Sequence, residues 1–350
     1  MGSDAEIARH RNAVIALAKP GGALAANALT ATTKNPEWFR VVAGTLRPTP
    51  LRAQLHDRLV AEQRSAVPNV VTDRRAIILA GPPGAGKGTQ LEKMLGDRVD
   101  QYLVVDADRF KNALLREALR DGSYDTWLKP PAIRELEDAG ERFFPLELAS
   151  LVHEKSSMLA VRLRHESIDA GTNLVVDSVL SNEASALALG RRLESAGYRI
   201  EVIDVEVPYE ISDGRIAARW QQSYEKALTG ENALGGRWVP SEYAHDVFDG
   251  PGGKSKPEAV AQKLAEACPA VDRYRLWRTT SEGTATTTPV GSWEKDLTRS
   301  AGRLIPTAVA ALFPASAAEQ LRRTPLMAPE APAANRAPAA SPDRGRELGD

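Results

Sequence analysis

The sequence contains a single cysteine, Cys268. One cysteine excludes a framework of internal disulfides and a zinc site built from several cysteine thiolates. Because Cys268 directly precedes Pro269 at the end of a helix-like stretch, we expect it to be a small buried apolar residue and not a catalytic thiol.

The sequence also lacks long apolar runs and an excess of charge of either sign. No apolar run approaches the roughly 20 residues that span a bilayer, and the first residues match neither a signal peptide nor a myristoylation motif. Lys and Arg number 45 and Asp and Glu number 46, so the total charge favours neither a nucleic-acid partner nor a membrane partner. We therefore expect a cytoplasmic protein without such partners.

A glycine-rich stretch, GPPGAGKGT, lies between an apolar run and a helical pattern. This order of strand, glycine-rich turn and helix is typical of a phosphate-binding loop and much less so of an ordinary turn. Glycines let backbone N–H groups face an anion, while the helix N-terminus and Lys87 add positive charge. We predict that ATP binds through the residues of this loop: Gly81, Pro82, Pro83, Gly84, Ala85, Gly86, Lys87, Gly88 and Thr89.

One position of the loop departs from the usual pattern. The residue after the lysine is normally Ser or Thr, which binds Mg²⁺, but here it is Gly88, followed by Thr89. The run resembles the loop of adenylate-kinase-type nucleotide kinases, which also carry Gly-Thr there. Our hypothesis is that Thr89 takes over the metal contact.

Apolar runs and helical stretches alternate from residue 73 onward. Alternation of this kind predicts parallel βαβ units, and hence an α/β fold with a doubly wound sheet of the P-loop kinase type. The expected strands lie at residues 76–80, 102–105, 173–176, 199–207 and 273–277, and the expected helices at 144–170, 182–196, 211–228 and 241–249.

The chain divides into three parts by pattern. Residues 1–70 are expected to form a helical N-terminal extension, with helices at 7–17 and 50–65. Residues 71–280 are expected to form the domain of the P-loop kinase type, in which the polar stretch 121–144 is expected to be a lid or a substrate-side insertion. Residues 281–350 form a C-terminal extension, partly helical over 293–323 and then disordered in a tail rich in Ala and Pro.

Two aspartates, Asp106 and Asp108, follow the second apolar run. A carboxylate at that strand end can accept the proton of an attacking hydroxyl or hold magnesium. Either residue alone could equally be a helix N-cap, but the pair after a phosphate loop favours function.

Three arginines lie in or near the helical region that follows the fourth strand: Arg215, Arg219 and Arg237. Phosphoryl transfer spreads negative charge over the equatorial oxygens, and arginines commonly neutralise it. A solvated helix face is the alternative, and for Arg215 it is the favoured one.

Together these motifs resemble the zeta-toxin kinases of bacterial toxin–antitoxin systems. The match covers roughly residues 76–248. It rests on VVDADRFK at 104–111, on the 21 residues from Lys87 to Asp108, on GTNLVVD at 171–177, and on the arginines after Val207-Pro208.

By this resemblance Asp108 is the catalytic base, Lys87, Arg219 and Arg237 hold the phosphates, and Asp177 faces the acceptor. We assign Asp106 and Glu154 to the acceptor as well, with His153 as the other possibility on that helix. The family implies ATP and Mg²⁺ as cofactors, the 3′-hydroxyl of UDP-N-acetylglucosamine as acceptor, and an antitoxin as protein partner. Asp177 departs from the family, where Glu is common.

Two other functions remain open from the sequence. The Lys87-Gly88-Thr89 loop also suits a nucleotide or small-metabolite kinase, which would act on AMP-like acceptors. A protein of a different class, a nucleotide-binding regulatory protein that works through its helical ends, would keep its effect without Asp108.

Overall fold

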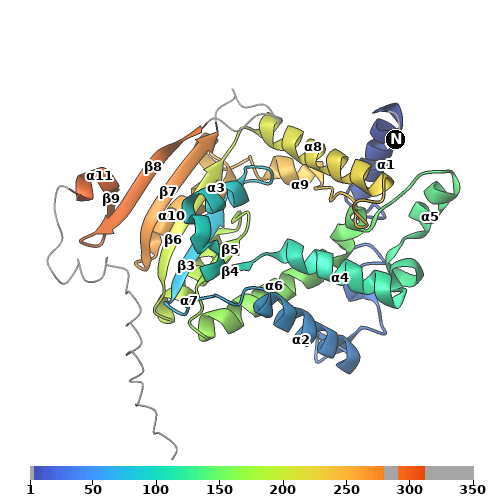
Figure 1. Cartoon of the computed structure of the whole chain (residues 1–350), viewed down its shortest axis with the longest axis horizontal. Helices are drawn as coiled ribbons and strands as arrows, with labels where there is room; N and C mark the ends of the chain where they lie inside the picture. The colour runs from blue at the N-terminus through green and yellow to red at the C-terminus, as the bar shows by residue number, and fades with distance from the viewer. Residues whose placement is uncertain (1–3, 280–290, 312–350) are drawn as a thin grey trace, which may run out of the picture. The chain divides into compact units, whose positions relative to one another are not determined.

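A seven-stranded sheet organises residues 4–279 and 291–311, the part of the chain that this computed structural model describes (Figure 1). Five parallel strands come first. Their order across the sheet is β4 (Leu103–Val105), β5 (Leu174–Asp177), β3 (Arg75–Ala80), β6 (Arg199–Glu206) and β7 (Val271–Thr279). The predicted α/β fold with a mainly parallel sheet is confirmed, and the strand that leads into the phosphate loop stands at the centre of the parallel set.

Two antiparallel strands extend the sheet beyond β7: β8 (Gly291–Ser300) and β9 (Arg303–Pro306), followed by the short α11 (Thr307–Ala310). The helical structure predicted over 293–323 is therefore wrong for residues 293–306, whereas residues 307–310 are helical. Local periodicity missed the strands because β8 is stabilised across the sheet, where Arg273 bonds Asp296 and the Trp277 ring meets Trp293 edge-on at 5.3 Å. The predicted disordered tail lies outside the described residues.

Successive residues of β3 point to opposite faces of the sheet, as extended geometry requires. Ile78 packs on one face with α7 (Glu183–Ser195) and α10 (Lys256–Ala267), whereas Ile77 packs on the other with α3 (Lys87–Leu95). Burial on both faces explains why this strand is a continuous apolar run.

Long elements are inserted between β4 and β5. They begin with α4 (Ala107–Asp121), a short helical turn (Tyr124–Leu128) and α5 (Pro131–Asp138). A 3₁₀ helix, η4 (Pro145–Val152), then leads into α6 (His153–Asp169), so the single helix predicted over 144–170 is in fact two elements. The insertion supplies one side of the site described below.

The N-terminal part packs on this insertion. Its elements are α1 (Asp4–Ala18), the 3₁₀ turn η1 (Thr32–Lys34), the hairpin of β1 (Phe39–Val42) and β2 (Thr45–Pro48), and α2 (Pro50–Ser65). Ile7, Val14 and Leu59 share a core with Phe110 and Leu159 of α4 and α6. Both predicted helices are present, and the hairpin was not predicted.

After β6 the chain forms α8 (Tyr209–Leu228), a loop, and α9 (Ser241–Asp246). Within the described residues, no helix combines the length and the apolar character that a bilayer crossing requires.

Candidate active site

The loop between β3 and α3 has the shape that a phosphate requires, and glycine is needed at defined points. Gly81 adopts φ 131° and Gly84 φ 74°, in the region that side chains rarely enter. A Cβ atom at Gly81 would lie 2.1 Å from the Val205 carbonyl oxygen, and one at Gly84 2.8 Å from that of Ser212. Gly88 is different, because a Cβ atom there would meet open space.

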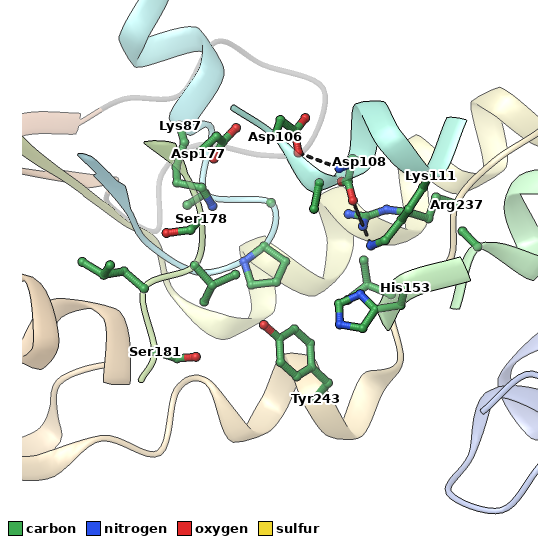
Figure 2. A pocket seen from close by; sticks show the side chains of 18 of the residues that line it. Lys87, Asp106, Asp108, Lys111, His153, Asp177, Ser178, Ser181, Arg237 and Tyr243 are labelled. Carbon is green, nitrogen blue, oxygen red and sulfur yellow. Dashed lines mark hydrogen bonds and ion pairs between the residues drawn. The ribbon is translucent and has the colours of Figure 1, made fainter. Parts of the chain in front are cut away.

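A cavity of about 1030 Å³ opens at the carboxyl ends of the parallel strands, beside this loop (Figure 2). Ligands bind at this edge in open α/β sheets. Most of the predicted site residues line it: Pro83, Gly84, Ala85, Gly86, Lys87, Gly88, Thr89, Asp106, Asp108, Asp177, Arg215, Arg219 and Arg237. Gly81 and Pro82 are buried behind the lining part of the loop.

Lys87 folds back on its own loop. Its Nζ donates to the carbonyl oxygens of Gly81 at 2.9 Å and Pro82 at 3.2 Å. Burial lowers the pKa of Lys87, while the nearby Asp177 and Glu206 carboxylates oppose this. A phosphate entering the loop would offer the ammonium group a full negative charge in place of two carbonyl dipoles.

Asp106 caps helix α4 and also lines the cavity. Its Oδ1 accepts a hydrogen bond from the Asp108 backbone N–H at 2.8 Å. The capping role weighed for this residue is therefore present. Burial, with the Asp108 charge next to it, raises the pKa of Asp106 to about 6.

Asp108 is held by two cations at the same oxygen. Lys111 Nζ donates to Oδ1 at 2.9 Å and Arg237 Nη1 at 2.6 Å, as Figure 2 shows. Burial alone would raise the pKa of Asp108, but Arg237 and Lys111 outweigh it and hold this pKa below its ordinary value. No described residue hydrogen-bonds Oδ2, which leaves that oxygen available to a substrate.

Lys111 is the site residue that sequence reasoning missed. It is 7% exposed and stands three residues after Asp108, so both side chains lie on one face of α4. That spacing was a signal present in the sequence.

The arginines of α8 and the following loop converge on the cavity. Arg219 makes no ion pair with any described residue, and burial, followed by the nearby Arg237, lowers its pKa. Arg215, for which a solvated helix face was favoured, instead donates from Nη1 to the loop carbonyls of Gly84 at 3.1 Å and Ala85 at 3.4 Å. Arg215 therefore helps to hold the backbone of the phosphate loop in place.

Two of the three carboxylates assigned to the acceptor, Asp177 and Glu154, have different surroundings. Asp177 ends β5 opposite Leu79 of β3 and lines the cavity; burial raises its pKa and Lys87 opposes this. Glu154 does not line the cavity, since its Oε2 accepts from the Thr33 hydroxyl at 2.8 Å. His153 lines it instead, because one residue along a helix turns the side chain by about 100°.

The donor set suits magnesium only together with a nucleotide. The Thr89 hydroxyl and the carboxylates of Asp106 and Asp177 offer oxygen ligands in the cavity. Within residues 4–279 and 291–311, no cluster of three or more His, Cys, Asp or Glu side chains could hold a metal ion. Mg²⁺ commonly needs only one or two protein oxygens, because substrate phosphates and water supply the rest. The residues present therefore fit the ion.

The central parallel sheet, the loop and the cavity define a domain of the P-loop kinase type. The zeta toxin family model matches residues 131–275, which confirms the resemblance noted from the sequence. The match covers the insertion from α5 onward, α8 and the arginine-bearing loop.

Curated relatives also match part of this chain. An adenylate kinase of Rhizorhabdus wittichii is 32% identical over 155 residues, which are 44% of this chain and 62% of that protein. One of Syntrophobacter fumaroxidans is 28% identical over 144 residues, covering 41% of this chain and 59% of that protein. The chain thus spans about three fifths of the length of these relatives.

Among solved structures, the AvrRxo1-ORF1:AvrRxo1-ORF2 complex with sulphate ions contains a similar chain. The TM-score is 0.50 at 18% identity, over 76% of this chain and 72% of that one. This likeness concerns the fold alone.

Proposed function

We propose that this protein is an ATP-dependent kinase of the zeta-toxin type, which transfers the γ-phosphoryl group to a hydroxyl of a small acceptor. The observation that carries the proposal is Asp108. It shares one cavity with the phosphate loop, two cations fix its Oδ1, and no residue in the described part of the chain hydrogen-bonds its Oδ2. A carboxylate in that position can accept a proton from an attacking hydroxyl.

The proposed reaction uses the chain's own groups as follows. ATP places its phosphates on the loop N–H groups, and Lys87 turns from the Gly81 and Pro82 carbonyls to the phosphates. The acceptor hydroxyl attacks the γ-phosphorus and passes its proton to Asp108 Oδ2. The bond from the γ-phosphorus to the bridging oxygen breaks, and ADP leaves with the electron pair.

Charge neutralisation supplies much of the rate in such reactions. Lys87, Arg219 and Arg237 line the cavity and would share the charge that develops on the transferring group. Mg²⁺, held by Thr89 with phosphate oxygens, would neutralise further charge on ATP.

The acceptor follows from the family resemblance. We propose a nucleotide sugar, with UDP-N-acetylglucosamine as the first compound to test, and Asp177 and Asp106 as the carboxylates beside it. An antitoxin protein is the proposed partner on the same ground.

A second function deserves a direct comparison. The adenylate kinase matches and the Lys87-Gly88-Thr89 loop support a nucleotide kinase, in which AMP would be the acceptor. A phosphate acceptor ionises on its own and needs no carboxylate base. Asp108 therefore favours a hydroxyl acceptor.

The test is ATP consumption by the purified protein with Mg²⁺ and no acceptor, with UDP-N-acetylglucosamine, or with AMP. We expect stimulation by the nucleotide sugar and a loss of at least about 100-fold in Asp108→Asn, as is usual when a general base is removed. Asp125→Asn is the matched control, since that side chain is 65% exposed and does not line the cavity. Stimulation by AMP alone would support the second function, and equal activity of Asp108→Asn would refute the role of the base.

A further inference from the structure

We infer that residues 18–33, from the end of α1 into η1, form the acceptor-side wall of the cavity and help to select the acceptor. This inference rests on the proposed function. Ala18, Leu24 and Ala26 line the same cavity as the phosphate loop, although they lie more than 50 residues before it. The zeta toxin match begins only at residue 131, so this wall lies outside the matched segment.

The wall lies on the side of Asp108 and not on the side of the loop. Figure 2 shows His153 on the same side of the cavity as Asp108 and Lys111, across from Lys87. Ser150 lies one turn before His153, and its hydroxyl donates to the backbone carbonyl of Leu24. The segment therefore lies where an acceptor would approach the base, while ATP occupies the loop.

Side-chain bonds hold the segment against η4 and the start of α6. Besides Ser150, the Thr32 hydroxyl donates to the Leu151 carbonyl at 3.0 Å, and the Thr33 hydroxyl donates to Glu154 at 2.8 Å. Thr32 is 1% exposed, so its bond is shielded from water. These contacts also explain why Glu154 is turned away from the cavity.

A buried histidine fixes the helix that precedes the wall. His10 is 1% exposed, and its Nδ1 lies 2.9 Å from a Glu141 oxygen and its Nε2 3.0 Å from a Glu147 oxygen. A carboxylate at each nitrogen favours the protonated ring, in which both nitrogens donate. The ring also stacks on Tyr224 of α8, with centroids 4.5 Å apart. Helix α1 is thus tied to both the insertion and α8.

The chemistry of the wall limits what it can bind. Ala18, Leu24 and Ala26 face the cavity together with Ala149, and none of them carries a charge. A phosphate group would find no cation on this surface. The acceptor therefore presents a neutral, partly apolar group to the wall, while its reacting hydroxyl lies at Asp108.

The first test adds a bulky side chain to the wall, where it would occupy part of the acceptor's space. Ala26→Trp should raise the KM for UDP-N-acetylglucosamine about tenfold or more, equivalent to about 1.4 kcal/mol, and leave the KM for ATP within about twofold. Asn27→Trp is the matched control, because Asn27 is exposed and does not line the cavity. An unchanged acceptor KM, or equal losses for ATP and acceptor, would overturn the inference.

A second test works without turnover. Cys268 is 5% exposed, so in Ala26→Cys the new thiol is the accessible one for a maleimide. We expect UDP-N-acetylglucosamine to slow labelling at residue 26 severalfold and ATP alone to leave the rate unchanged. If the nucleotide sugar does not change the labelling rate, or if ATP slows labelling equally, the inference that this segment contacts the acceptor is wrong. Absence of turnover in the unmodified protein defeats the proposed kinase instead, so the two failures are distinguishable.

Discussion

Replacing Lys111 by methionine removes one of the two cations on Asp108 while keeping the length and bulk of the side chain. The lost contact is a charge-assisted hydrogen bond of 2.9 Å, a class worth about 1.5–3 kcal/mol. Because the Asp108 side chain is 41% exposed, water screens the pair and the lower end applies. We expect kcat/KM of the proposed kinase to fall about tenfold, which corresponds to about 1.4 kcal/mol.

The same change should alter the pH profile. Arg237 and Lys111 now hold the pKa of Asp108 below its ordinary value, so this base stays ionised into the acid range. Losing Lys111 raises that pKa, and the acid limb of kcat/KM against pH should move to higher pH. Lys111→Arg should return the acid limb part of the way to its original pH, because it restores the positive charge beside Asp108.

The assay is kcat/KM for the acceptor between about pH 4 and 9, measured under conditions where the protein stays folded. Lys129→Met is the matched control: its ammonium group pairs with Asp125 and Glu137, and its side chain is 13% exposed and does not line the cavity. Asp106 and His153 also titrate nearby, so His153→Asn is measured alongside. An acid limb that stays in place in Lys111→Met would refute the reasoning.

Three further predictions concern His10, which holds helix α1 in place, and the phosphate loop. His10→Ala should lower the free energy of unfolding by about 3 kcal/mol in urea melts at pH 6. Its carboxylate partners outweigh burial and raise the pKa of His10, so its contribution is full below the ordinary histidine pKa and is lost as pH rises through the folded value. Gly81→Ala should abolish ATP binding in calorimetry, because the added Cβ meets a carbonyl oxygen at 2.1 Å. Thr89→Ala should weaken Mg²⁺ binding, so that the ATPase assay needs a higher Mg²⁺ concentration for half-maximal activity. Adding Gly88→Thr should restore the original requirement, since position 88 has open space for the hydroxyl-bearing side chain. Intact binding or absent rescue would contradict these two.

The sequence predicted best where one local rule acts alone. The strand before the loop is buried on both faces, so its apolar run and its glycines identified β3 and the phosphate loop directly. The pairing of β8 with β7 depends on contacts such as Arg273 with Asp296, between residues 23 positions apart, and local periodicity does not report them. Glu154 and His153 show a finer limit. Adjacent helix residues point in directions about 100° apart, and the family resemblance did not fix which of the two residues matches the acceptor-binding position. The sequence therefore could not decide which of them faces the site. The N-terminal wall required tertiary structure, because its link to the cavity is a contact between Ser150 and Leu24.

The contact between Arg237 and Asp108 bears on the order in which substrates add. Until a phosphate group of ATP binds the Arg237 guanidinium, this guanidinium stays hydrogen-bonded to Asp108, next to the position that the acceptor hydroxyl must occupy. ATP brings the charge that Arg237 prefers, whereas a neutral sugar group does not. The acceptor-ready arrangement therefore forms after ATP has bound, and Lys111, buried on the same helix, keeps Asp108 in place during the exchange. Addition should be ordered, with nucleotide first, and product inhibition by ADP should be competitive with ATP and not with the acceptor.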